Sequence, residues 1–260
     1  MIIDTHCHLD DEQFDDDLED VISRARQSGL RGMIIPGADM DDLPKSLYIS
    51  YAYDDVYFAS GVHPYNANNF NAKYIKEVAE DQRCVAIGEC GLDYFRLKKD
   101  FEQPNDREAN KRLQKEVFVA QIQIATKLQK PLIVHARDAN QDIYDTIKEH
   151  GSGLVGGVLH CYNASELLLE LKDMNFYFGI GGVLTFKNAK NLVEILPQIP
   201  ISRLLVETDA PYLAPMPNRG KRNEPSYTTL VVDKISELLG LSTLDIEDIT
   251  TKNAKTLFRI

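Results

Sequence analysis

The chain has 260 residues and a formal net charge of −11 at pH 7, with 43% hydrophobic and 27% charged residues. This length and composition fit one large α/β domain over residues 1–260 better than two small ones. No run of about 18 apolar residues is present, which excludes a membrane-spanning helix, and the N-terminus predicts a strand rather than a signal peptide. We therefore expect a cytoplasmic protein without membrane contact.

Eight short apolar runs predict β-strands. In chain order they cover residues 1–5, 32–37, 56–62, 84–89, 131–135, 155–160, 176–181 and 203–208. Apolar residues at helical spacing fill most of the intervals, most clearly Leu113, Val117, Ala120, Ile124 and Leu128. Repeated βα units over this length predict a single-domain TIM (β/α)8 barrel. A doubly wound sheet is the competing architecture, but it would place phosphate-binding glycines at one or two strand ends, and no such motif is present.

Potential metal ligands follow the predicted strands. The first strand runs into His6 and His8, and residues two apart in an extended segment share a face, so both imidazoles can reach one ion. Later strands end in, or are followed by, further candidates: His63, Glu89, His135, His160, Glu207 and Asp209. Catalytic groups of a (β/α)8 barrel lie at the C-terminal ends of its strands. The sequence therefore predicts a metal site at that end of the barrel.

Several longer segments carry a resemblance to a known family. They are DTHCHLD (residues 4–10), GVHP (61–64), IGECGLDY (87–94), HARDA (135–139), HC (160–161), ETDAPYL (207–213) and RNEP (222–225). Together they resemble the TatD family of metal-dependent deoxyribonucleases over essentially the whole chain. The resemblance implies a barrel of the amidohydrolase superfamily that hydrolyses DNA with divalent metal ions. The chain departs from the family pattern at residues 162–164, which we expect to touch substrate rather than metal.

Phosphodiester hydrolysis suggests a division of the candidate ligands. It needs a hydroxide and positive charge near the phosphorus, and two divalent ions about 3.5–4 Å apart supply both. We expect the first ion to be held by His6, His8 and Asp209 and the second by His135 and His160. Glu89 is expected to bridge the two ions and to take part in catalysis. The mixed donor set is compatible with Mg²⁺, Zn²⁺, Mn²⁺ or Ni²⁺.

Three further residues receive roles near these ions. Asp209 is the candidate general base, because a metal-bound carboxylate that faces the bridging water can accept its proton. Glu207 lies two residues earlier on the same face, where it either hydrogen-bonds a histidine ligand or contributes to an additional metal site. His63 is expected to bind phosphate or an extra cation, the alternative being a histidine of the core.

The acidic total charge argues against a DNA-binding surface over the whole molecule. Contact with DNA must therefore come from local groups of basic residues. Basic residues gather in loops at the predicted catalytic end: Arg96, Lys98, Lys99, Arg107, Arg137, Arg219, Lys221 and Arg222. Arg137 and Arg222 are placed to grip a phosphate through a bidentate fork. Such a small basic mouth suits strand ends and flexible single strands. We expect a monomeric 3′–5′ exonuclease that acts on single-stranded or damaged DNA without an obligate protein partner.

Two other function classes are compatible with the sequence. A small-molecule amidohydrolase could use the same metal centre on a lactone, an amide or a base to be deaminated. A metal-binding protein without catalysis is the second alternative, and the complete ligand set argues against it.

Overall fold

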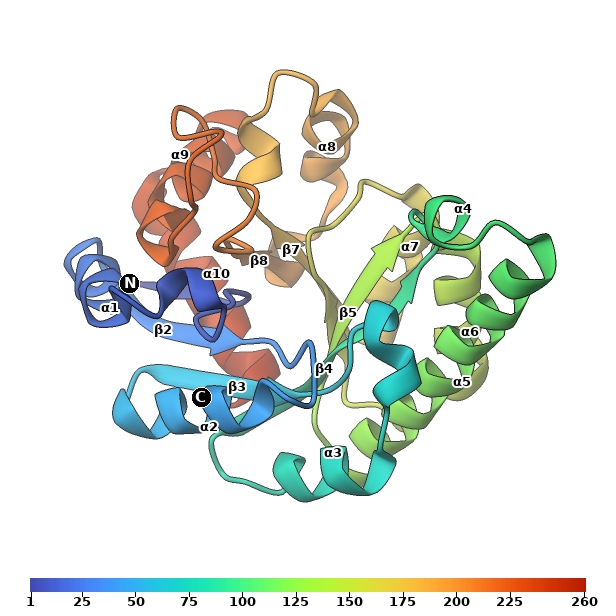
Figure 1. Ribbon diagram of the computed structural model, residues 1–260. Helices are drawn as coiled ribbons and strands as arrows, with labels where there is room; N and C mark the ends of the chain where they lie inside the picture. Colours follow the sequence, from blue (N-terminus) through green and yellow to red (C-terminus); the bar gives the residue numbers. More distant parts are fainter.

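The computed structural model describes residues 1–260 and places eight parallel strands in one sheet, in the order β1 to β8 (Figure 1). The strands are β1 Ile2–Asp4, β2 Leu30–Ile35, β3 Val56–Ser60, β4 Cys84–Asp93, β5 Leu132–Arg137, β6 Gly157–Leu159, β7 Phe176–Ile180 and β8 Leu204–Val206. The ends of the sheet meet where the Thr5 amide donates to the Val206 carbonyl (3.1 Å) and Cys7 forms a parallel bridge with Ala210. The predicted (β/α)8 barrel is confirmed.

Helices surround the strands, with α5 and α6 on one side of the molecule and α9 and α10 on another (Figure 1). The helices are α1 Leu18–Gln27, α2 Leu43–Ala52, α3 Ala72–Ala79, α4 Leu97–Asp100, α5 Pro104–Leu128, α6 Asn140–His150, α7 Glu166–Leu169, α8 Lys190–Ile195, α9 Thr228–Leu239 and α10 Thr243–Phe258. Helix α5 begins earlier than its apolar spacing predicts, at a proline of the kind favoured in a first helical turn. None of the helices combines the length and apolar character needed to cross a bilayer.

Strand β4 is the main departure from the predicted elements. The sequence predicts an end at Glu89, but the strand continues to Asp93 because Gly91, Leu92 and Asp93 pair with β5. The register shifts between Ile87 and Cys90. A bulge of this kind bends a strand and re-aims one side chain, and here it lies at Glu89.

The floor of the barrel is closed from outside the sheet. Side chains from all eight strands, among them Ile3, Ile133 and Leu205, form one buried cluster inside the barrel. The last turn of α10 adds Leu257 and Phe258 to this cluster. The opposite, C-terminal end of the strands is left open for polar side chains.

We predict that Phe258→Ala lowers the free energy of unfolding by about 3–5 kcal/mol, because it removes a buried aromatic ring and leaves a cavity in the floor. Urea unfolding followed by circular dichroism measures the loss. The matched control is Leu244→Ala on the same helix, where the side chain is 69% exposed and a change below about 0.5 kcal/mol is expected. Equal losses in the two variants would contradict the role of Phe258 in closing the barrel floor.

Candidate metal centre

Four donor atoms from three strand ends form the first group. His6 Nε2 lies 3.3 Å from His8 Nε2 and 3.4 Å from Glu89 Oε2. Asp209 Oδ1 lies 3.6 Å from the His6 nitrogen and 3.5 Å from the His8 nitrogen. Ligand atoms about 2.0–2.1 Å from a tetrahedral metal are about 3.3–3.4 Å apart, so these four spacings are close to those expected around a divalent ion.

Three donor atoms form a second group beside the first. Glu89 Oε1 lies 3.0 Å from His135 Nδ1 and 3.1 Å from His160 Nε2. The two histidine nitrogens are 3.4 Å apart. The ring of His160 stacks on that of His6 with 3.7 Å between centroids, so the two groups are direct neighbours. This group also fits a divalent ion and leaves coordination positions free on the pocket side.

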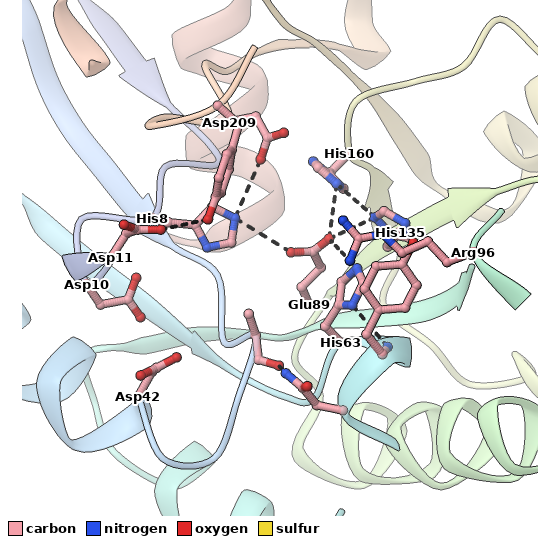
Figure 2. A pocket seen from close by; sticks show the side chains of 14 residues that line it. His8, Asp10, Asp11, Asp42, His63, Glu89, Arg96, His135, His160 and Asp209 are labelled. Carbon is pink, nitrogen blue, oxygen red and sulfur yellow. Dashed lines mark hydrogen bonds and ion pairs between the residues drawn. The ribbon is translucent and has the colours of Figure 1, made fainter. Parts of the chain in front are cut away.

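Glu89 divides its two carboxylate oxygens between the groups (Figure 2). Its side chain is 4% exposed, and burial raises its pKa, but the imidazoles of His160 and His6 outweigh burial and hold this pKa well below its usual range. A buried, ionised carboxylate with one oxygen toward each donor group has the geometry of a bridging ligand. All six predicted ligands are thus brought together by the fold.

Local backbone geometry presents Glu89 to the pocket. Gly88 has a φ of +155°, and a Cβ at this position would lie 2.6 Å from the Ile133 carbonyl oxygen. Only glycine allows strands β4 and β5 to approach so closely beside the bulge. The sequence pattern predicted the carboxylate at this strand end but did not reveal the bulge.

Asp209 is held in a left-handed conformation with a φ of +59°. Its amide donates to the His6 carbonyl (2.9 Å), which ties the loop after β8 to the loop after β1. Asn223 steadies the same loop by donating to the carbonyls of Thr208 and Tyr212. Burial raises the pKa of Asp209, but the hydrogen bond from His8 and the nearby imidazoles hold it below its ordinary value. The carboxylate is therefore ionised at neutral pH.

Two further carboxylates orient histidines of the second group. Asp93 Oδ2 lies 3.0 Å from His135 Nε2, which leaves Nδ1 of that ring for a metal. Glu207 is fully buried, accepts from the Cys161 amide (2.6 Å) and lies 3.4 Å from His160 Nδ1. The placement of Glu207 favours the histidine-orienting alternative over an additional metal site.

Asp93 was not among the predicted site residues. It lies four residues after Glu89 and has the same parity along an extended strand, so the alternation of side chains was an available signal. The prediction stopped at Glu89 because the apolar run stops there. Arg96 and Tyr65, which line the pocket, were also not predicted as contact residues.

His63 lies beside the second group, with Nε2 3.8 Å from Glu89 Oε1. Its Nδ1 accepts the backbone N–H of Tyr65 (3.1 Å), and burial lowers its pKa to about 3. A neutral imidazole whose Nδ1 accepts must carry its proton on Nε2. His63 therefore presents an N–H donor, which suits a phosphate oxygen better than a cation.

The predicted phosphate-binding arginines do not line the pocket. Arg222 forms two hydrogen bonds with Asp17 (2.8 and 2.7 Å), and Arg137 lies over the ring of Phe95, 3.7 Å from its centroid. The ion pair with Asp17 engages the guanidinium of Arg222, and the predicted contact of Arg222 with phosphate stays a prediction. Arg96 instead provides a guanidinium in the pocket wall and forms no ion pair.

The pocket above the two donor groups has a volume of about 410 Å³ and two unlike sides. Figure 2 shows Asp10, Asp11 and Asp42 on the side of His8, and Arg96 on the side of His135. The donor groups lie between these sides. A substrate bound here would meet carboxylates on one side and a cation on the other.

A (β/α)8 barrel with histidine and carboxylate donors at its strand ends defines the class of protein as a metal-dependent hydrolase. The model of the family described as "TatD related DNase" matches residues 3–259. The chain belongs to this family.

Relatives cover the whole chain. It is 44% identical to the "Uncharacterized metal-dependent hydrolase YabD" of Bacillus subtilis, with 100% of both chains covered. It is 33% identical to the "3′-5′ ssDNA/RNA exonuclease TatD" of Klebsiella pneumoniae, with 100% of this chain and 98% of the relative covered. The crystal structure of the TatD homologue YJJV from Escherichia coli superposes with a TM-score of 0.90 at 26% identity, over 100% of this chain and 98% of that one.

We predict that Asp93→Ala weakens the binding of a divalent ion by about 10- to 100-fold, because His135 loses the partner that orients it. Equilibrium dialysis against Zn²⁺ with elemental analysis measures this. The control is Asp142→Ala, which removes a nearby carboxylate that accepts from Tyr94 and does not contact a histidine. Zn²⁺ binding with unchanged affinity and stoichiometry in Asp93→Ala would contradict the role of Asp93.

Proposed function

We propose that the chain is a two-metal 3′–5′ exonuclease that hydrolyses single-stranded or damaged DNA. The observation that carries the proposal is the division of the Glu89 oxygens between two complete donor groups. Two divalent ions held there would supply a hydroxide at neutral pH and positive charge at the phosphodiester. The family relationship and the exonuclease name of the Klebsiella relative support DNA as the substrate.

Metal binding and proton transfer are assigned to residues of the site. His6, His8 and Asp209 would hold one ion, His135 and His160 would hold the other, and Glu89 would offer one oxygen to each group. Asp209 is the general base: Oδ1 faces the histidines, whereas Oδ2 forms no hydrogen bond and the side chain is 15% exposed. An ionised carboxylate in this position orients the attacking water and accepts its proton.

The side of the pocket that carries Arg96 and His63 would bind the phosphate. The guanidinium of Arg96 rests on the ring of Tyr65, 4.8 Å from its centroid, and has no carboxylate partner to release before it binds an anion. His63 adds a neutral donor beside it. Together they would neutralise and orient one phosphodiester over the two metal ions.

The other side of the pocket favours a second candidate function. Asp10, Asp11 and Asp42 would repel a long polyanion, and they could accept hydrogen bonds from amino or hydroxyl groups of a small substrate. A small-molecule amidohydrolase with the same metal centre uses this side instead of Arg96. The two candidates therefore differ in which wall of the pocket affects turnover.

Added Mg²⁺, Mn²⁺ or Zn²⁺ is expected to restore release of labelled nucleotides from single-stranded DNA by EDTA-treated protein. Asp209→Asn should lower the restored rate about 10²- to 10⁴-fold, because it removes the general base. Glu89→Ala should abolish the metal response while circular dichroism stays native. No release by the wild type under any of the metals would place the small-molecule hydrolase first.

Arg96→Ala should raise KM for single-stranded DNA about 10- to 100-fold, since it removes a charge-assisted contact to phosphate. Steady-state kinetics on a short oligonucleotide tests this. Arg222→Ala is the matched control, because its guanidinium is committed to Asp17 and should leave KM unchanged. A DNA-cleaving enzyme indifferent to Arg96→Ala would refute the assigned phosphate contact.

A further inference from the structure

The segment between β4 and α4 carries an exposed aromatic ring directly before a residue that lines the metal pocket. Phe95 is 53% exposed, although most large apolar side chains of the chain are buried. Its neighbour Arg96 lines the metal pocket, and its neighbour Tyr94 lines a second pocket of about 400 Å³. The two chain neighbours of Phe95 thus line two different cavities.

One face of the Phe95 ring is already covered. The guanidinium of Arg137 lies 3.7 Å from the ring centroid and supports the ring from that side. Because the residue is more than half exposed, the uncovered surface is the opposite face and the ring edge. A flat aromatic surface backed by a cation is a general form of stacking platform for nucleobases.

The second pocket supplies cations next to this platform. Lys98, Arg107 and Lys111 line it. Lys111 pairs with Glu108, whereas Lys98 forms no ion pair. The arrangement suits a backbone phosphate next to a base that rests on Phe95.

Asp93 connects the Phe95 segment to the metal centre. The Phe95 amide donates to Asp93 Oδ1 (2.9 Å), and Oδ2 of the same carboxylate lies 3.0 Å from His135 Nε2. Arg137 follows His135 by two residues on β5. The backbone that carries the ring is thus held by the same side chain, Asp93, that orients a proposed metal ligand.

We propose that Phe95 and Arg137 form a nucleobase-stacking subsite, and that Lys98 binds the phosphate beside that base. This inference rests on the proposed nuclease function and extends it to the chemical group recognised outside the metal pocket. A nucleotide would place one phosphodiester over the metal centre and its neighbouring base on Phe95. The subsite recognises any base, because every base has a flat π face.

Fluorescence quenching of 2-aminopurine tests the subsite without requiring turnover. The full chain with added Mg²⁺ is mixed with phosphorothioate oligonucleotides that resist hydrolysis and carry 2-aminopurine at the first, second or third nucleotide from either end. We expect quenching at one position, lost in Phe95→Ala and retained in Phe95→Trp. The matched control is Tyr51→Ala, since Tyr51 is 55% exposed but contacts Asp81 at the opposite end of the barrel.

Kinetics separate stacking from a structural effect. Phe95→Ala should raise KM for a short oligonucleotide about tenfold or more and leave kcat within about twofold. KM for an oligonucleotide of the same length that is abasic at the quenched position, and so has no ring to stack there, should be the same for wild type and Phe95→Ala. Phe95→Trp should restore KM for the oligonucleotide.

The outcomes distinguish this inference from the proposed function. Equal quenching by wild type and Phe95→Ala, or no quenching by wild type at any position, overturns the subsite. Quenching that depends on Phe95 in a protein that never cleaves DNA supports the subsite and overturns the nuclease. DNA cleavage with a KM indifferent to Phe95→Ala supports the nuclease and overturns the subsite.

Discussion

The carboxylate of Glu89 is ionised inside the barrel, and the arrangement of the strand ends depends on this buried charge. A carboxylate removed from water is costly unless donors or cations surround it. His6, His135 and His160 approach it from three other strands. The shifted register of β4 and the absence of a side chain at Gly88 place the carboxylate where all three imidazoles reach it.

The imidazoles impose a second constraint on one another. His6 and His160 stack so closely that positive charges on both rings would repel each other. Metal ions are the other source of positive charge that can balance the carboxylates of Glu89 and Asp209. Metal binding to such a set displaces protons from the histidines, so ion occupancy and proton occupancy compete. Asp93 and Glu207 act outside this set by fixing which ring nitrogen faces inward.

The sequence predicted those site residues whose positions depend on short, local residue patterns. His135 and His160 end apolar runs, so their positions at the mouth of a barrel followed from periodicity alone. Asp93 was missed because the apolar run ends at Glu89, whereas a bulge carries β4 on to Asp93. The parity that Asp93 shares with Glu89 was the one signal for it in the sequence. The surroundings of Arg222 could not be predicted, because its partner Asp17 is distant in sequence and is brought near only by the closed barrel. Likewise, the basic residues near the mouth were recognisable as a group, whereas the choice of Arg96 for the pocket wall depends on how that loop folds.

The closure of the barrel floor by the end of α10 has a consequence for how the chain folds. Phe258 and Ile3 belong to one interior cluster although they lie near opposite ends of the sequence. Contacts between such distant residues form slowly, because a long loop must close before any burial compensates the lost chain entropy. Until α10 docks, an assembling barrel exposes the apolar interior of its strands to water. The floor of the barrel is therefore covered only when the two ends of the chain meet, on the side away from the metal pocket.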